Sequence, residues 1–436
     1  MKTALLFIAL ICLSYQESRL RRSRHSKHGE DCFSDSACEE GLYCKINRCM
    51  TKYEMNNMKK LGLYENNVCS MLKKCKGDKV CRKHRCVDPN TPVESPKANK
   101  EIEEDVHLIF GGSIFLNKKP YMSGYKSDKT FNYDHLFKHI SKYIKSADLS
   151  IVDQQTLFYI DDKEDNKINE KHTPKELGDA IANAGFKLVL HANSLSYMYK
   201  DKGIFNTINY WNNNHPNIHH LGISSTESQS EKDYYIFEKN GIKIGIINFS
   251  GLVVRGLPKN KKYMVNVIDI NKVKNCVGEL KKETDFVIVC MNWGIRTNTS
   301  PNGYQIKMAK ALIHYGADLI IGNHPSNVQP VSYIRTENGR KGLVFFSLGN
   351  LIFDDNKNKN ALGALASIVI SKGKDKAHIS SYRLIPTINH NDETNEYTVY
   401  KLSDYTRELG LKTNKKFSMA KVKLSCSKLM GAFAYC

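Results

Sequence analysis

The sequence predicts a layered α/β domain that follows a small cysteine-rich module. From residue 106, short apolar runs rich in β-branched residues alternate with stretches whose apolar residues recur at helical spacing. Such alternation is typical of an α/β architecture with functional groups on loops at strand ends. A chain of 436 residues can bury one large core and a small appended module.

The N-terminal residues 1–18 have the pattern of a secretory signal peptide. A lysine precedes an apolar run, and small residues follow it where a peptidase could cut. We therefore expect a protein that is secreted or lies in the lumen of a secretory vesicle, and no later run has the length of a membrane span. The basic segment 19–31 contains Arg19-Leu20-Arg21-Arg22, which fits either a propeptide cleaved by furin-type convertases or a solvated basic linker.

Eight cysteines form a duplicated motif, C-x5-C-x5-C-x4-C, in residues 32–49 and again in 69–86. Each cysteine of the second copy lies 37 positions after its counterpart, as 69 follows 32. Units this small need cross-links, and a secretory route favours disulfides over zinc. The spacing does not choose among the three connectivities that four cysteines allow. The cysteines are Cys32, Cys38, Cys44, Cys49, Cys69, Cys75, Cys81 and Cys86.

These repeats loosely resemble secreted modules of the Dickkopf N-terminal type, which implies a binding or spacer role. The charged segment 88–105 follows these repeats and contains three prolines, which predicts an interdomain linker.

The expected strands and helices of the large domain follow in order. The expected strands are 106–112, 148–153, 186–193, 243–250, 285–294, 317–323 and 343–350. The expected helices are 134–146, 175–184, 270–283 and 303–316.

Four cysteines and two sequons remain outside these motifs. Cys426 and Cys436 flank a short C-terminal segment and are expected to pair, whereas Cys276 and Cys290 are either joined or two buried thiols. Asn248 and Asn298 begin glycosylation sequons, and Asn298 is the better acceptor because a loop is predicted there.

The chain is strongly basic. Its 65 lysines and arginines exceed its 45 aspartates and glutamates, giving a formal charge of +20. On a secreted protein such an excess favours polyanionic partners, for example acidic polymers or glycans. Nucleic acid is not expected as a partner, because no nucleic-acid-binding motif is present.

The region 106–386 resembles the bacterial capsule-synthesis CapA family, the poly-γ-glutamate capsule type, within the calcineurin-like metallophosphoesterase superfamily. The resemblance is strongest between Asp285 and Phe353 and leaves 387–436 as a C-terminal extension. It rests on Asn292-Trp293-Gly294, Pro301, Gln305, Ala309, Gly316-Ala317-Asp318, Gly322-Asn323-His324-Pro325-Ser326, Val328-Gln329-Pro330 and Ser347-Leu348-Gly349-Asn350. It implies an α/β/β/α sandwich with a metal centre above the sheet edges.

The resemblance implies carboxylate and imidazole metal ligands at the strand ends. Most of the corresponding positions in this sequence carry a neutral residue. The positions are Gly112, Gln155, Asn193, Leu195, Asn292, Asn323, His324 and Ser326, of which His324 alone keeps an imidazole. Amides and hydroxyls cannot balance two divalent cations as carboxylates and imidazoles do. We therefore expect a domain that is degenerate as an enzyme and needs no cofactor.

One smaller metal site remains open from the sequence. His191 and Asn193 alternate onto one face of a strand end. His191 could therefore join His324 and Asp153 around a single divalent metal. The alternatives are a capped strand-end role for His191 and a backbone-bonded loop role for His324. Trp293, Ser347 and Asn350 are expected to pack or fix turns.

Three functions remain in competition. The first is a secreted, non-catalytic CapA-like protein that binds or organises an acidic polymer such as poly-γ-glutamate. The second is an active metal-dependent hydrolase, or an enzyme of poly-γ-glutamate synthesis or export, with altered ligands. The third is a secreted cysteine-rich ligand or toxin-like protein in which the large domain is a scaffold.

Overall fold

The structure is a computed structural model that divides into two compact units, Met1–Lys100 and Glu101–Cys436. It describes the backbone of strand residues 42–45, 48–51, 80–82 and 85–87, and residues 104–159, 173–354, 362–373, 376–391, 397–413, 417–430, 434 and 436.

Two antiparallel hairpins are described in the first unit. Strand β1 (Leu42–Lys45) pairs with β2 (Arg48–Thr51), and β3 (Val80–Arg82) pairs with β4 (Arg85–Val87). Cys44 stands opposite Cys49 in the first ladder, and Cys81 stands opposite Cys86 in the second. Several predicted features lie outside the described residues, and their assignments stay predictions. They are the signal peptide, the basic segment 19–31, most of the linker and the side chains of all eight repeat cysteines.

The second unit contains a six-stranded sheet in the order β13-β14-β12-β11-β10-β9. Its four central strands are parallel, and β9 and β13 close the edges antiparallel to their neighbours. The strands are β9 (Tyr234–Lys239), β10 (Ile242–Ser250), β11 (Phe286–Asn292), β12 (Leu319–Asn323), β13 (Val328–Arg335) and β14 (Lys341–Leu348).

A second, eight-stranded sheet has the order β18-β17-β16-β5-β6-β7-β8, with β15 paired to β5. Strands β5 to β8 are parallel, and β16 to β18 form an antiparallel meander beside them. The strands are β5 (Glu104–Ile114), β6 (Leu149–Gln154), β7 (Leu188–Leu190), β8 (His219–Leu221), β15 (Asn350–Ile352), β16 (Leu362–Lys372), β17 (Ala377–Asn391) and β18 (Tyr397–Lys401).

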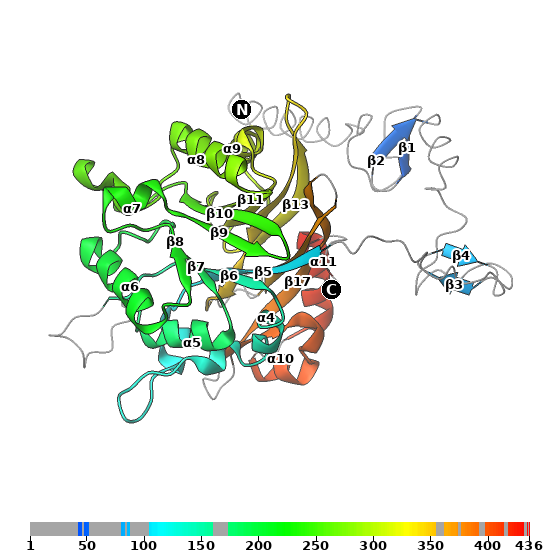
Figure 1. Ribbon diagram of the computed structural model, residues 1–436. Coiled ribbons are helices and arrows are strands. Elements are labelled where there is room, and N and C mark those ends of the chain that lie inside the picture. Colours follow the sequence, from blue (N-terminus) through cyan, green and yellow to red (C-terminus); the bar gives the residue numbers. More distant parts are fainter. Residues whose placement is uncertain are drawn as a thin grey trace, which may run out of the picture. The chain divides into compact units, whose positions relative to one another are not determined.

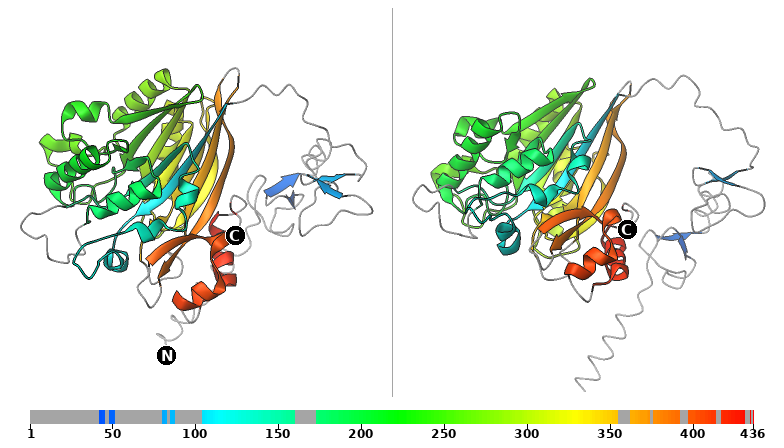
Figure 2. Two further views of the ribbon diagram at one scale, coloured as in Figure 1. Left: turned by 60° about the horizontal axis from the view of Figure 1, so that its bottom comes forward. Right: turned by 90° about the horizontal axis from the view of Figure 1, so that it is seen from below.

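Apolar residues of the two sheets meet in a shared core, to which Leu108 of β5 and Ile246 of β10 belong. The other face of the eight-stranded sheet packs on α5 (Glu176–Ala184) and α6 (Lys200–Asn214) through Trp211. The other face of the six-stranded sheet packs on α8 (Ile270–Glu283) and α9 (Gly303–Tyr315) through Leu312. Figures 1 and 2 show helices outside both sheets, so the predicted α/β/β/α sandwich is confirmed.

Several helices carry clear end signals. Asn302 and Gln305 form a capping box at the start of α9, and Gly185, at φ 102°, ends α5 in the left-handed region. The helices are α3 (Lys118–Ser123), α4 (Ser141–Ile144), α5 (Glu176–Ala184), α6 (Lys200–Asn214), α7 (Glu227–Glu231), α8 (Ile270–Glu283), α9 (Gly303–Tyr315), α10 (Arg407–Thr413) and α11 (Met419–Met430), with 3-10 turns η2 (Asp134–Phe137), η3 (Lys259–Met264) and η4 (Leu402–Asp404). None of the helices described has the length and apolar character that crossing a bilayer requires.

Two expectations about element boundaries were wrong. The stretch 134–146 is η2 followed by α4 and not one helix, because the chain makes a separate turn between them. The boundary at residue 386 falls inside β17, and β18 extends the same sheet, so the described part of 387–436 belongs to the domain.

The C-terminal cysteines behave as predicted. Cys426 and Cys436 form a disulfide bond. Cys276 and Cys290 are free thiols, and they lie on opposite faces of the six-stranded sheet. The alternative that these two cysteines are separate thiols is therefore confirmed, although Cys276 is only half-buried.

Candidate functional site

The predicted site residues follow the carboxyl ends of parallel strands from both sheets. Asp153 lies in β6, Asn292 ends β11, and Asn323 ends β12. Because carboxyl ends of parallel strands lie at the same sheet edge, these side chains can approach one another across the sandwich.

Asp153 is the carboxylic acid at the centre of this edge. It is 2% exposed, and its Oδ2 accepts hydrogen bonds from Ser113 Oγ at 2.7 Å and from Asn292 Nδ2 at a longer 3.5 Å. Its Oδ1 has no hydrogen-bond partner among the described residues. Burial raises the pKa of Asp153 to about 7, and the hydrogen bonds from Ser113, Asn292 and Gln155 only partly oppose this.

Ser113, and not Gly112, is the β5 residue that faces Asp153. The β5–β6 register shifts between Phe110 and Ser113, which then pairs with Asp153. A Cβ atom on Gly112 would lie 2.3 Å from the carbonyl oxygen of Gly349, so no side chain fits there. The assignment of Gly112 as a site position was therefore wrong, and Ser113 was missed. The Gly-Gly pair, which often marks a bulge in a strand, was the signal that could have found it.

Amides and hydroxyls extend the contacts of Asp153 on both sides. Gln155 Nε2 donates to Ser113 Oγ at 3.0 Å. On the other side, Asn292 Oδ1 accepts from the backbone N–H of Ser194 at 3.2 Å, and Ser194 Oγ lies 3.4 Å from His324 Nδ1. Gln155, Asn292 and His324 therefore belong to one network around one carboxyl group.

His324 reaches this network from a strained backbone. Its φ is 95°, in the left-handed region that non-glycine residues rarely adopt. Burial and the nearby Arg296 lower the pKa of His324, so its ring is neutral at neutral pH. Its hydroxyl contact with Ser194 differs from the purely backbone-bonded role considered from the sequence.

Asn193 and Leu195 shape the loop that follows β7. Asn193 Nδ2 donates to the carbonyl oxygens of Gln154 and His191, at 2.9 and 3.2 Å. Its Oδ1 accepts from the backbone N–H of Leu195 at 2.9 Å. Asn193 is thus satisfied by backbone, and Leu195 offers no polar atom from its side chain.

His191 points away from this network. Its ring is fully buried, with its centroid 6.3 Å from that of Trp211 and 6.2 Å from that of His220. Burial lowers the pKa of His191 well below its ordinary value. No group of three or more His, Cys, Asp or Glu side chains placed to hold a metal occurs in the part of the chain that the structure describes. The rearranged site of His191, His324 and Asp153 is therefore not formed.

The remaining motif residues hold the loops together. Trp293 is buried and donates from Nε1 to the carbonyl oxygen of Phe346, and Ser347 Oγ donates to the carbonyl oxygen of Pro325. Both packing roles agree with the sequence prediction. Asn323 and Ser326 are also buried, and Asn323 Oδ1 has no partner among the described residues.

The donor set does not fit a pair of divalent cations. The described hydrogen bonds to Asp153 come from Ser113 and Asn292, and Gln155 donates to Ser113; all three side chains are neutral. Two nearby dications need several carboxylates to offset their repulsion. The chemistry that this arrangement offers is hydrogen bonding from neutral groups.

Basic and apolar side chains lie on two loops beside the network. The backbone N–H groups of Gly251 and Val254 donate to the carbonyl oxygens of Asn292 and Ser194, at 2.7 and 2.9 Å, and so hold one loop over the site. Arg255 on this loop and Arg296 on the loop after β11 are exposed. The exposed apolar residues of these loops are Leu252, Val254 and Ile295.

The two sequons differ in accessibility. Asn248 is 2% exposed, accepts from Ala192 N–H at 2.7 Å and donates to the Cys290 carbonyl at 3.2 Å. A glycan on Asn248 is incompatible with this fold, so that assignment was wrong. Asn298 is exposed, and its glycosylation stays a prediction.

Comparisons with known proteins place the large domain among capsule synthesis proteins. The family model described as "Bacterial capsule synthesis protein PGA_cap" matches residues 107–355. The capsule biosynthesis protein CapA of Bacillus anthracis is 24% identical over 275 residues, which cover 61% of this chain and 63% of that protein. The PGA biosynthesis protein CapA of Bacillus subtilis is 24% identical over 283 residues, covering 64% of this chain and 72% of that protein. The chain thus spans less than two thirds of the B. anthracis relative.

Similar solved structures include two phosphoesterase-type proteins. A 5'-nucleotidase precursor from Thermus thermophilus is 11% identical with a TM-score of 0.41, covering 74% of this chain and 58% of that chain. The calcineurin-like phosphoesterase YfkN from B. subtilis is 13% identical with a TM-score of 0.38, covering 74% of this chain and 99% of that chain. TM-scores this low provide no evidence about the fold beyond the strand order described above.

Proposed function

The chain belongs to the family of bacterial capsule synthesis proteins PGA_cap, and on that premise we propose that it is a secreted, non-catalytic member that binds an acidic polymer such as poly-γ-glutamate. The observation that carries this proposal is the hydrogen-bond network around Asp153. Ser113 and Asn292 donate to that carboxyl group, and Gln155 donates to Ser113; all three side chains are neutral, which favours binding over metal-dependent hydrolysis.

The charge of the chain and of the site loops supports a polyanionic partner. The formal charge is +20, and the exposed Arg255 and Arg296 lie on loops beside the network. A carboxylate polymer would pair with these guanidinium groups, while Leu252 and Ile295 would contact its methylene groups. The acidic polymer is poly-γ-glutamate in this proposal because the B. subtilis relative is named for PGA biosynthesis.

Secretion is supported by the sequence of residues 1–18 and by a described disulfide bond. Cys426 and Cys436 are paired, and such bonds persist in oxidising compartments.

A binding assay with poly-γ-glutamate over a series of salt concentrations tests the proposal. We expect affinity to fall steeply as salt rises, because each ion pair is screened. The double variant Arg255→Gln/Arg296→Gln should bind about tenfold more weakly, as expected for the loss of two charge-assisted contacts.

The matched control is Arg335→Gln. Arg335 is exposed and is the last residue of β13, where that strand pairs with the start of β14. This end of the sheet is opposite to the end that carries the site. Binding that ignores salt, or an equal loss in the control, would contradict polymer binding at these loops. Turnover of a phosphate ester by the purified protein with added Mn²⁺ would contradict the non-catalytic assignment.

A further inference from the structure

The two exposed arginines beside the site are held in different ways. The Cζ atom of Arg296 lies over the ring of Phe353, 5.4 Å from its centroid. Arg255 has no such ring contact among the described residues, and its Nε donates to Met198 Sδ at 3.4 Å. Neither arginine forms an ion pair within the part of the chain that the structure describes. Both positive charges are therefore available to an anion, and that of Arg296 rests on an aromatic ring.

The ring of Phe353 is fixed at the edge of the sandwich that carries the site. Phe353 directly follows β15 and Phe115 directly follows β5, and these two strands are parallel neighbours. The two rings stack with centroids 5.7 Å apart and an interplanar angle of 18°, and Phe353 is 8% exposed. The backbone N–H of Phe115 donates to the carbonyl oxygen of Ile352 at 2.9 Å, and the hydroxyl of Tyr397 donates to that of Phe353. Phe353 and Phe115 thus form an aromatic platform that is held by both backbone and ring contacts.

The loop that carries Arg296, residues 293–302 between β11 and α9, is fixed by buried amides. Asn327 Nδ2 donates to the carbonyl oxygen of Thr297 at 2.6 Å. Gln329 Nε2 donates to the carbonyl oxygens of Asn298 and Ser300, at 3.2 and 3.0 Å. A binding group on a fixed loop loses little conformational entropy when its ligand arrives.

The guanidinium group of Arg296 keeps its hydrogen-bond donors for a ligand. An aromatic ring attracts the positive charge but supplies no oxygen acceptor, so the contact with Phe353 leaves the N–H groups free to donate. The acid next to the platform, Asp354, lies 3.8 Å from Lys119 Nζ in an ion pair. The charge of Arg296 also extends to the network, because it contributes to the lowered pKa of His324. A carboxylate is the anion that accepts two parallel N–H bonds from such a group.

We propose that the aromatic platform holds the guanidinium group of Arg296 in position to receive a carboxylate of the polymer. Arg296 is then the principal carboxylate-binding residue of the site, and Phe353 is its positioning residue. This inference rests on the proposed polymer binding and names the chemical group that the site recognises. The physical reason is preorganisation, since Arg255 lacks an aromatic support and loses more side-chain freedom when it binds.

Isothermal titration of the full chain with poly-γ-glutamate tests the inference in a double-mutant cycle. Arg296→Gln should weaken binding by about fivefold and Arg255→Gln by about twofold. Phe353→Leu should weaken binding by about threefold, the loss expected for one exposed cation–π contact. It should cause no further loss when combined with Arg296→Gln, and the same loss of about threefold when combined with Arg255→Gln, because the ring supports Arg296.

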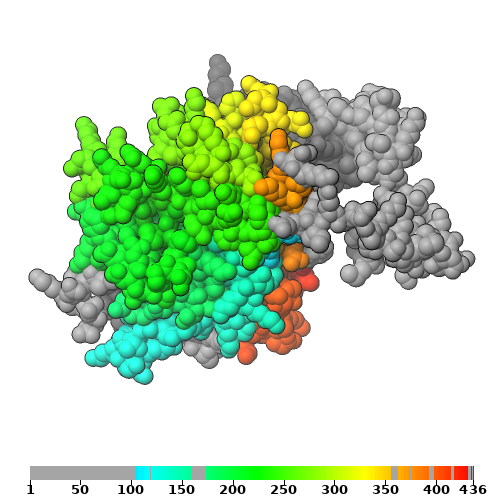
Figure 3. Space-filling view, viewed as in Figure 1, coloured from blue at the N-terminus to red at the C-terminus, as the bar shows by residue number. Residues whose placement is uncertain are grey.

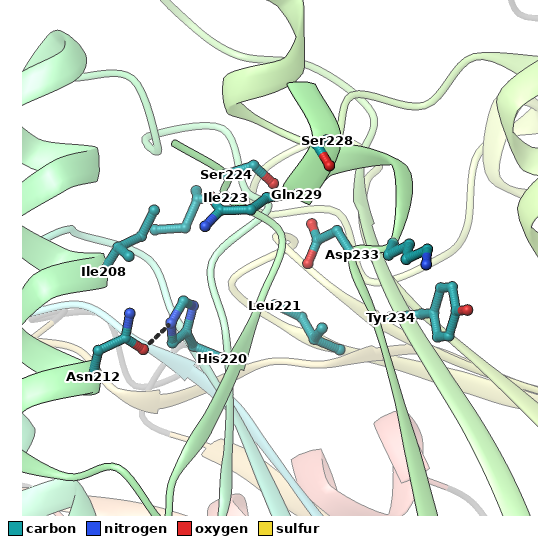
Figure 4. A pocket seen from close by; sticks show the side chains of 11 residues that line it. Ile208, Asn212, His220, Leu221, Ile223, Ser224, Ser228, Gln229, Asp233 and Tyr234 are labelled. Atoms are coloured by element: carbon teal, nitrogen blue, oxygen red, sulfur yellow. Dashed lines mark hydrogen bonds between the residues drawn. The ribbon is translucent and has the colours of Figure 1, made fainter. Parts of the chain in front are cut away.

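A hollow on another part of the domain supplies a charge-matched control. It measures about 470 Å³ and lies among α6, the end of β8, α7 and the start of β9, where Figure 4 shows His220 bonded to Asn212. Figure 3 shows the green segments carrying α6 and α7 on one face of the molecule. Lys232 lines this hollow, is exposed, and belongs neither to the network nor to the two arginine loops. Lys232→Gln removes one positive charge and should weaken binding by less than about twofold, because a distant charge is screened.

The mobility of Arg296 gives a second readout that needs no polymer. Nitrogen-15 relaxation of the arginine Nε–H groups reports their order parameters. Phe353→Leu should lower the order parameter of Arg296 and leave that of Arg255 unchanged, whereas a general loss of stability would not distinguish the two. Melting curves verify folding. If Phe353→Leu fails to fold, Phe115→Leu, which removes the half-exposed ring stacked on Phe353, should show the same dependence on Arg296.

Three outcomes would overturn this inference while leaving polymer binding intact. They are a loss from Phe353→Leu that is the same with and without Arg296→Gln, an unchanged order parameter of Arg296, and a loss in Lys232→Gln as large as that in Arg296→Gln. The last would mean that total charge, and not a positioned guanidinium group, determines affinity. Failure of the wild-type protein to bind poly-γ-glutamate would overturn the proposed function together with this inference.

Discussion

Ser113 Oγ donates a 2.7 Å hydrogen bond to Oδ2 of Asp153, and the two residues are paired across β5 and β6. The carboxyl group at the centre of the strand-end site is thus held by a hydroxyl of the neighbouring strand. Since both residues are buried, this contact links the chemistry of the site to the stability of the fold.

The variant Ser113→Ala tests this link. We expect a loss of about 1–2 kcal/mol in the free energy of unfolding, because a buried carboxyl group loses a hydrogen-bond donor. Urea denaturation measures it. Ser332→Ala, at an exposed position of β13, is the matched control and should change stability by less than about 0.5 kcal/mol. Equal effects of the two substitutions would contradict the assigned role.

The pH dependence of stability tests the environment of Asp153. Burial raises the pKa of Asp153 from 3.8 to about 7, so the folded protein binds this proton more tightly than the unfolded chain does. The binding of this proton therefore contributes to the free energy of unfolding at low pH. The contribution falls by on the order of 3 kcal/mol as the pH rises from about 4 to 7.

The variant Asp153→Asn removes that titration. The stability difference, wild type minus variant, should decrease from pH 4 to pH 7 and then level off. Denaturation curves at several pH values measure it. A difference that increases over this range would mean that Asp153 is ionised and stabilised in the folded protein.

Chelation tests whether the site needs a metal. A bound metal stabilises the folded state by mass action, so its removal lowers the melting temperature. We expect no change on dialysis against EDTA and no increase on adding Mn²⁺ or Zn²⁺, because Asp153 is surrounded by neutral groups. Elemental analysis of the purified protein completes the test. A stoichiometric transition metal, lost together with thermal stability in EDTA, would show that the site holds one.

Reduction of the C-terminal disulfide should destabilise the attachment of α11. Cys426 is buried in the core shared by the two sheets and is bonded to Cys436, ten positions away. The double variant Cys426→Ser/Cys436→Ser should lower the free energy of unfolding by about 2–4 kcal/mol, as is typical for such a bond. Cys276→Ser, which removes a half-buried free thiol, is the control. An unchanged denaturation midpoint in the double variant would contradict a stabilising role.

The fold was largely readable from the sequence because its central strands are buried on both faces. Segments such as 286–292 and 319–323 are continuous apolar runs, which parallel strands between layers require. The edge strands β8 and β9 and the meander β16 to β18 were not predicted. Strand β8 is only three residues long, and the first half of β17 mixes exposed and partly buried residues, so these two strands carry a weaker signal.

The site was readable only in part. Its strand-end positions, including Asn292 and His324, follow from motif spacing. The bulge before Ser113 moved the functional side chain one position along the chain, and the three-residue strand β7 let His191 turn toward Trp211. Such local shifts depend on the register between strands, which motif spacing does not specify.

The sequence by itself thus determined the layered architecture, the family and the neutral residues at most of the strand-end positions, because these depend on apolar periodicity and residue identity. Tertiary structure alone decided that Ser113 holds Asp153 and that Asn248 is inaccessible to a glycan. The physical reason is that hydrogen-bond partners and burial are set by contacts between segments far apart in the chain, which no local pattern encodes.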